Sequence, residues 1–142
     1  MTGEEPPPAV TVRPATATDV DALVAMLVEV AGEGRWIGTE APVDVERRRR
    51  RMAADVDAED AVVLVAAGWR GRGVGTALLA EAVRRARQAG AHKLALQVWP
   101  HNTAAIALYE RFGFQREGYL RRHYRRRSGE LWDAVVMGLP LD

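Results

Sequence analysis

The sequence predicts a mixed α/β fold of about five strands and four helices, built as one domain over residues 10–142. Short β-rich runs alternate along the chain with amphipathic runs of helical period, as in layered α/β proteins. The apolar run Ala61–Ala67 comes directly before a glycine-rich loop and a helix, which predicts a buried strand. The chain closes with two strand-like runs joined by Ser128-Gly129, which predicts a hairpin.

Each predicted element follows from local periodicity. Strands are expected where β-branched or alternating residues are bounded by turn residues: Val10–Arg13, Val62–Ala67, Leu94–Trp99, Gly118–Arg126 and Leu131–Met137. The first helix should begin at a Thr18 cap, with Asp21 in the capping-box position. Three more helices are expected at Val43–Ala54, from the glycine loop to Ala89, and from an Asn102 cap to Gly113. The segment Val62–Trp99 should form a parallel strand–helix–strand unit with a right-handed crossover, in one sheet with the other strands.

Composition narrows the class of protein. The chain has 142 residues, a formal net charge of +1 and no cysteine. The low net charge provides no overall field toward nucleic acid or membrane, and the lack of cysteine removes disulfides and thiolate metal sites, so no metal is expected. Residues 1–9 are polar and proline-rich, which predicts a disordered tail and not a signal peptide. No apolar run approaches the roughly 20 residues that span a bilayer. A cytoplasmic protein without membrane contact is expected.

A glycine-rich loop, Arg70–Gly75, joins a predicted strand to a helix. The first N–H groups of a helix have no partner in the chain and lie at the positive end of its dipole, so such a turn can bind an anion. Glycine lets the backbone approach a pyrophosphate, and arginine adds charge-assisted contacts. The expected cofactor-binding residues here are Arg70, Gly71, Arg72, Gly73, Val74, Gly75 and Thr76.

Two other nucleotide loops fit less well. A Rossmann loop has Gly-x-Gly-x-x-Gly and an acidic residue about 20 positions later. Here the glycines form Gly-x-Gly-x-Gly, and the following strand offers Gln97 and Trp99 but no carboxylate. A P-loop needs Gly-Lys-Ser/Thr, and the lysine is missing.

The loop and the start of its helix resemble the acetyl-CoA loop of the GNAT superfamily, Gln/Arg-x-x-Gly-x-Gly/Ala. The stretch Asn102–Phe114, with its Asn, Ala, Leu-Tyr and Gly-Phe, is similar to the downstream motif of that family. The last hairpin and the stretch Gly34–Glu40 look like the branch that acetylates amino acids and other small amines. The resemblance covers nearly the whole chain. It implies an N-acetyltransferase that moves an acetyl group from acetyl-CoA to a small primary amine by direct attack in a ternary complex.

The resemblance also implies residue roles. The strands Val62–Ala67 and Leu94–Trp99 should splay apart, and backbone near Leu64 and Val65 should bind the pantetheine arm and the thioester carbonyl. Asn102 should bond the arm, and Tyr109 should protonate the leaving thiolate. The two side chains are seven residues apart, which puts them on one helix face. Plainer interpretations remain open: a core strand, a simple N-cap at Asn102, and a core tyrosine.

Several groups of the sequence could deprotonate the amine. Some family members use a carboxylate on the strand before the loop, and Glu59 lies near that place, as does Asp60. Glu59 is therefore the expected base. A solvated turn, a water chain, His101 or His123 remain alternatives.

The chain departs from the resemblance at one place. Between Asp55 and Gly68 it has room for one strand of about 5–6 residues, where family members have three, so a central hairpin is missing. The first strand is then expected to pair antiparallel with Val62–Ala67, and apolar surface should be exposed on the first helix. The same gap favours an alternative function, a degenerate CoA-binding module without turnover.

Two arginine runs, Arg47–Arg51 and Arg121–Arg127, raise the question of nucleic-acid binding. Consecutive arginines on a helix point in all directions, and few aromatic residues lie among them for base stacking. No nucleic-acid partner is expected, and the runs should be solvated faces. An edge strand of the last hairpin offers a route to a homodimer.

Overall fold

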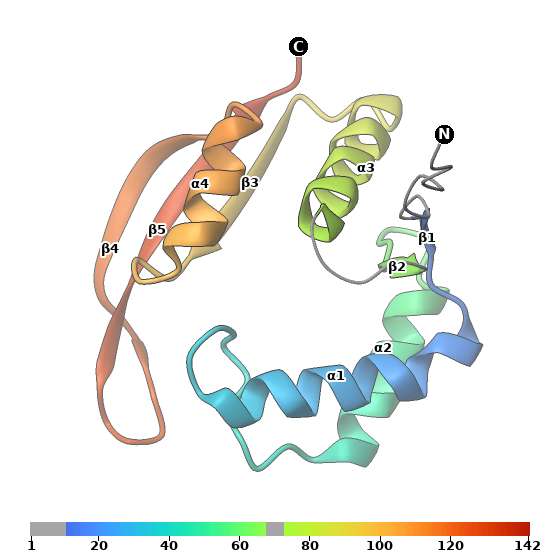
Figure 1. Ribbon diagram of the computed structural model, residues 1–142, viewed down its shortest axis with the longest axis vertical. Helices are drawn as coiled ribbons and strands as arrows, with labels where there is room; N and C mark the ends of the chain where they lie inside the picture. The colour runs from blue at the N-terminus through green and yellow to red at the C-terminus, as the bar shows by residue number, and fades with distance from the viewer. Residues whose placement is uncertain (1–10, 68–72) are drawn as a thin grey trace, which may run out of the picture.

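A computed structural model describes residues 11–67 and 73–142 of the chain (Figure 1). The described elements are β1 (Thr11–Pro14), the 3-10 turn η1 (Ala17–Asp19), α1 (Val20–Glu33), α2 (Val45–Asp57), β2 (Leu64–Ala67), α3 (Val74–Gln88), β3 (Lys93–Val98), α4 (Thr103–Arg111), β4 (Gln115–Arg125) and β5 (Leu131–Pro140). The predicted mixed α/β class is confirmed. The predicted tail, residues 1–9, lies outside the described residues. No described helix combines the length and apolarity needed to cross a membrane.

The five strands form two sheets, so the prediction of one sheet was wrong. β1 pairs with β2, and β3, β5 and β4 form a second sheet in that order. The predicted antiparallel pairing of the first strand is confirmed, with Arg13 opposite Val65. β2 and β3 do not pair with each other. α3 packs against both of them and separates the two sheets (Figure 1). β2 and β3 are therefore connected through their packing on α3 and not through backbone hydrogen bonds to each other.

The missing hairpin leaves the molecule open. Among the described residues between α2 and α3, one strand is present, β2. Met26 on α1 is 60% exposed and Val62 is 50% exposed. The prediction of exposed apolar surface on the first helix is therefore confirmed.

The main core lies between α4 and the three-stranded sheet. Alternate residues of β3 point toward α4, since Leu94, Leu96 and Val98 are more buried than their neighbours. The buried members of this cluster come from four elements or their ends: Val98, Ile106, Phe114, Val135 and Met137. β5 contributes the most buried side chains because it is the central strand. This core fixes the position of α4 on the sheet.

The entry to α1 differs from the predicted Thr18 cap. The Asp19 carboxylate accepts the Thr16 backbone N–H at 2.8 Å and two guanidinium bonds from Arg13 at 2.7 and 2.9 Å. These bonds close η1 and tie β1 to the start of α1. The hydrogen bonds from Arg13 lower the pKa of Asp19 well below its ordinary range.

Candidate functional site

The start of α3 is set by a glycine. Gly73 is the residue before the helix and has φ +94°, a left-handed conformation that other residues adopt only with strain. Gly73 has no side chain to cap the helix. A helix start of this kind directs its first N–H groups, here those of Val74, Gly75 and Thr76, toward the place that an anion can occupy. The other predicted loop residues, Arg70, Gly71 and Arg72, lie outside the described residues.

A second glycine of the loop has a packing role. A Cβ atom placed on Gly75 would lie 3.2 Å from Cδ2 of Leu108 on α4. The lack of a side chain at Gly75 therefore allows the first turn of α3 to pack closely on α4. From the sequence, Gly75 was expected to take part in cofactor binding, and no packing role was predicted for it. The structure adds this contact, which joins the predicted diphosphate turn to the helix that holds Tyr109.

Asn102 and Tyr109 line the same cavity, which has a volume of about 420 Å³ and is called the tyrosine cavity below. Asn102 is the N-cap of α4, and its Oδ1 accepts the Ala105 N–H at 3.3 Å. Its amide NH₂ is not used by that bond. Tyr109 is half-buried, and its ring centre lies 5.6 Å from that of Phe114. Both residues thus have structural contacts and also border a space that a ligand can enter.

Aromatic residues that sequence reasoning did not select surround the rest of the tyrosine cavity. Its lining includes Trp36, Trp99 and Tyr124, and the Tyr124 hydroxyl donates to Oε1 of Gln97. Trp99 and Tyr124 come from the ends of β3 and β4, which are not adjacent in the sheet. The nearness of Trp99 to Asn102 in the sequence was the available clue. An apolar wall of this kind suits the uncharged arm of a ligand whose charged part lies elsewhere.

A buried arginine closes one side of this cavity. The side chain of Arg126 is 5% exposed, and its guanidinium carbon lies 5.6 Å from the ring centre of Trp99 and 4.3 Å from that of Trp132. Its Nη1 donates to the Gly38 carbonyl at 3.0 Å. Within the described residues Nη2 has no hydrogen-bond partner. The guanidinium group has its electrostatic contacts with the faces of the two rings and with the Glu40 carboxylate, whose Oε1 lies 3.6 Å from Nε. The prediction that Arg121–Arg127 is a solvated face was wrong at Arg126.

Three predicted site residues lie apart from Tyr109. Leu64 and Val65 are half-buried in β2, and Glu59 is exposed in the segment between α2 and β2. None of the three lines the tyrosine cavity. The edge of β2 that faces away from β1 has no strand partner among the described residues. Backbone groups along that edge are therefore open to a ligand, as the predicted splayed strands require.

The two histidines considered as bases have other contacts. Nε2 of His101 lies 2.7 Å from the Arg35 carbonyl oxygen. The His101 ring also packs edge-on against Trp132, with 5.2 Å between the ring centres. His123 packs edge-on against Tyr124 at 4.8 Å. The contacts of His101 help to hold the loop between α1 and α2 against the sheet.

Comparison with known proteins agrees with this geometry. The sequence model of the Acetyltransferase (GNAT) family matches residues 22–114, more than half of the chain. The [Ribosomal protein bS18]-alanine N-acetyltransferase of Escherichia coli (strain K12) is 38% identical over 73 residues, which are 51% of this chain and 49% of that protein. The L-amino acid N-acetyltransferase AaaT of the same strain is 32% identical over 96 residues, 67% of this chain and 56% of that protein. The chain thus spans about half the length of the curated relatives it matches.

Solved structures share the fold at lower identity. The phosphinothricin acetyltransferase (Pat) of Sinorhizobium meliloti, solved in complex with AcCoA, has a TM-score of 0.74 and 22% identity to this chain. The match covers 93% of this chain and 88% of that one. The likeness of the fold therefore extends over nearly the whole chain, beyond the part that aligns with the curated relatives.

Proposed function

Since the chain belongs to the acetyltransferase (GNAT) family, we propose that it transfers an acetyl group from acetyl-CoA to the primary amine of a small molecule such as an amino acid. The observation that supports this most is the cavity shared by Asn102 and Tyr109 of α4, the helix whose Leu108 lies against Gly75 in the first turn of α3. A relative that acts on L-amino acids, and another on the alanine of a ribosomal protein, agree with an α-amine as acceptor.

The residues fit acetyl-CoA in three places. The N–H groups at the start of α3 and the dipole of that helix suit the diphosphate. The unpaired edge of β2 and the Asn102 amide offer hydrogen bonds to the pantetheine arm, at Leu64, Val65 and Asn102. The apolar wall of the tyrosine cavity suits the acetyl end.

The proposed reaction is direct attack in a ternary complex. The neutral amine nitrogen forms a bond to the thioester carbonyl carbon, and the C–S bond breaks. The Tyr109 phenol gives its proton to the leaving sulfur, so that the products are an amide and a free thiol. The proton lost from the amine passes to Glu59 through water, because Glu59 does not line the tyrosine cavity. A backbone N–H of β2 near Val65 stabilises the negative charge on the carbonyl oxygen.

A second candidate function is a CoA-binding module without turnover. The absence of a hairpin between α2 and β2 favours this alternative. The wall that a hairpin would build is not there to hold an acceptor in place.

One pair of measurements separates the candidates. Thermal melting of the full chain is followed with and without saturating acetyl-CoA, since a ligand of the folded state raises Tm by mass action. Release of thiol from acetyl-CoA is then followed with a panel of amino acids and of alanine-starting peptides. A rise in Tm together with amine-dependent thiol release supports the enzyme. A rise in Tm without thiol release supports the module, and an unchanged Tm contradicts both. Glu59→Gln, compared with Asp60→Asn, tests the base through the pH profile of the rate.

A further inference from the structure

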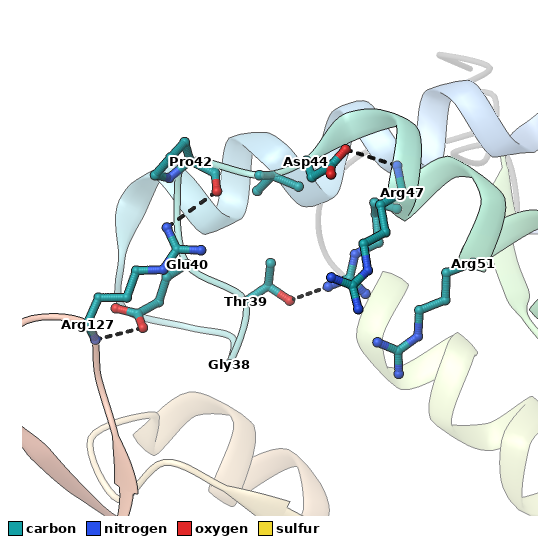
Figure 2. A pocket seen from close by; sticks show the side chains of 10 residues that line it. Gly38, Thr39, Glu40, Pro42, Asp44, Arg47, Arg51 and Arg127 are labelled. Carbon is teal, nitrogen blue, oxygen red and sulfur yellow. Dashed lines mark hydrogen bonds between the residues drawn. The ribbon is translucent and has the colours of Figure 1, made fainter.

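A second cavity, about 340 Å³ in volume, lies between α2 and the loop that follows α1. Its lining includes four arginines, so it is called the arginine cavity: Arg47, Arg48, Arg51 and Arg127 (Figure 2). Two carboxylates also border it, Glu40 and Asp44. Four positive groups against two negative groups leave an excess of two positive charges around one hollow.

The two carboxylates are directed at backbone amides. Asp44 is the N-cap of α2 and accepts the Arg47 N–H at 3.1 Å. Glu40 accepts the Arg127 N–H at 2.9 Å and lies 3.6 Å from Nε of the buried Arg126. Both carboxylates therefore have partners of their own and do not neutralise the guanidinium groups of α2 that line the cavity.

The α2 guanidinium groups that line the arginine cavity, those of Arg47, Arg48 and Arg51, form no ion pair among the described residues. Within Arg47–Arg51, the arginine run on α2, Arg49 is the residue that forms ion pairs, with Asp21 and with Glu46. Arg48 donates to the Thr39 hydroxyl at 2.9 Å, a neutral acceptor. Figure 2 shows the side chains of Arg47 and Arg51 on one side of α2. Like charges four residues apart on a helix repel each other, and cations in a first helical turn oppose the helix dipole. A bound anion relieves both costs.

The arginine cavity adjoins the tyrosine cavity. Gly38 lines both cavities, and the successive residues Arg126 and Arg127 line the tyrosine and the arginine cavity respectively. Because the two linings share Gly38, an acceptor that has its amine near Tyr109 and reaches past Gly38 would place another group near the arginines. Guanidinium groups bind carboxylate and phosphate oxygens by paired, charge-assisted hydrogen bonds.

We propose that the arginine cavity binds an oxyanion of the acceptor, a carboxylate or a phosphate separated from the reacting amine by several bonds. This inference rests on the proposed function, because it assigns a substrate class to the same site. The arginine cavity should favour acidic amino acids and similar anionic amines over neutral amines as acceptors.

The test is binding calorimetry on the full chain, with and without saturating coenzyme A. The probes are two matched pairs, L-glutamate with L-glutamine and O-phospho-L-serine with L-serine, which distinguish carboxylate from phosphate. In the wild type the anionic member of at least one pair should bind about tenfold more tightly, as two partly exposed ion pairs would provide. The double variant Arg47→Gln/Arg51→Gln should lose this preference. The control Arg50→Gln/Arg87→Gln removes the same charge from exposed positions outside the cavity lining and should keep it.

Several outcomes overturn the inference. Equal affinity for the charged and neutral members of both pairs in the wild type would do so. Equal loss in the double variant and its control would show a general effect of net charge. Tight, salt-sensitive binding of a DNA duplex that both double variants weaken alike would show a basic surface for nucleic acid. If coenzyme A fails to raise Tm while the arginine-dependent preference persists, the proposed function fails and the anion site stands.

Discussion

The guanidinium carbon of Arg126 lies 4.3 Å from the ring centre of Trp132, on the strand that pairs with β4. Through the bond from Arg126 to the Gly38 carbonyl, this contact joins the last hairpin to the loop between α1 and α2. The two cavities meet at Gly38. Stability and substrate binding should therefore depend on the same buried charge.

Replacing Arg126 tests this dependence. Arg126→Ala should lower the free energy of unfolding by about 3 kcal/mol, because it removes a buried group and leaves Glu40 without its charged partner. Arg121→Ala removes an exposed arginine of the same hairpin and should change stability by less than about 0.5 kcal/mol. Urea unfolding followed by tryptophan fluorescence measures both values. Equal effects of the two substitutions would mean that Arg126 does not hold the loop.

Gly73 should be intolerant of a side chain. At φ +94°, Gly73→Ala is expected to cost about 1–2 kcal/mol and to reduce the rise in Tm that acetyl-CoA produces, since the first turn of α3 would shift. Gly32→Ala is the matched control, because Gly32 lies in α1 with open space around it. That change should raise stability by about 0.5–1 kcal/mol. A Gly73→Ala protein with wild-type Tm and cofactor response would contradict the proposed turn.

Tyr109→Phe removes the hydroxyl and keeps the ring that packs near Phe114. Loss of a proton donor to the leaving thiolate should lower kcat about a hundredfold, with KM for acetyl-CoA and the cofactor-induced rise in Tm unchanged. Tyr119→Phe serves as the control because Tyr119 is exposed and lies outside the tyrosine cavity. If kcat is kept in Tyr109→Phe, the phenol is a packing group and another donor serves the sulfur.

Asp19 should make the fold sensitive to acid. Hydrogen bonds from Arg13 hold the pKa of Asp19 below its ordinary value of 3.8. The folded state therefore binds this proton less tightly than the unfolded state, and the stabilisation is present above pH 3.8 and lost as pH falls below it. Asp19→Asn should be less stable than wild type at pH 7, and the difference should shrink toward pH 2. Melting temperatures across this range measure it, with the exposed Asp57→Asn as control. A difference that stays constant with pH would contradict the ion pair.

Much of the fold could be predicted because its elements are local. The alternation of Leu94, Leu96 and Val98 and the glycine turn at Gly129 depend on near neighbours in the sequence, and the structure has a strand and a hairpin there. The antiparallel pairing of β1 with β2 could also be predicted, since only one strand fits between α2 and α3. The exact start of α1 could not, because Arg13, from a different element, selects Asp19 as its partner.

The parts that sequence could not supply depend on distant residues. The family resemblance implied that β2 and β3 splay apart, but no local pattern encodes the packing of α3 against both strands. Arg126 looked like one more residue of a basic run, and only the folded positions of Trp99 and Trp132 make it buried. Asn102 and Tyr109 were predictable as neighbours because one helix holds both.

The contact of Gly75 with Leu108 has a mechanical consequence. It places the turn proposed to grip the diphosphate directly against the helix that presents the phenol. The distance between this turn and Tyr109 should then select the acyl donor by length. A donor whose pantetheine arm matches this distance places its thioester next to the Tyr109 hydroxyl. A side chain at residue 75 would push α3 away from α4 and lengthen this distance. The pantetheine arm of acetyl-CoA would then no longer reach Tyr109 correctly.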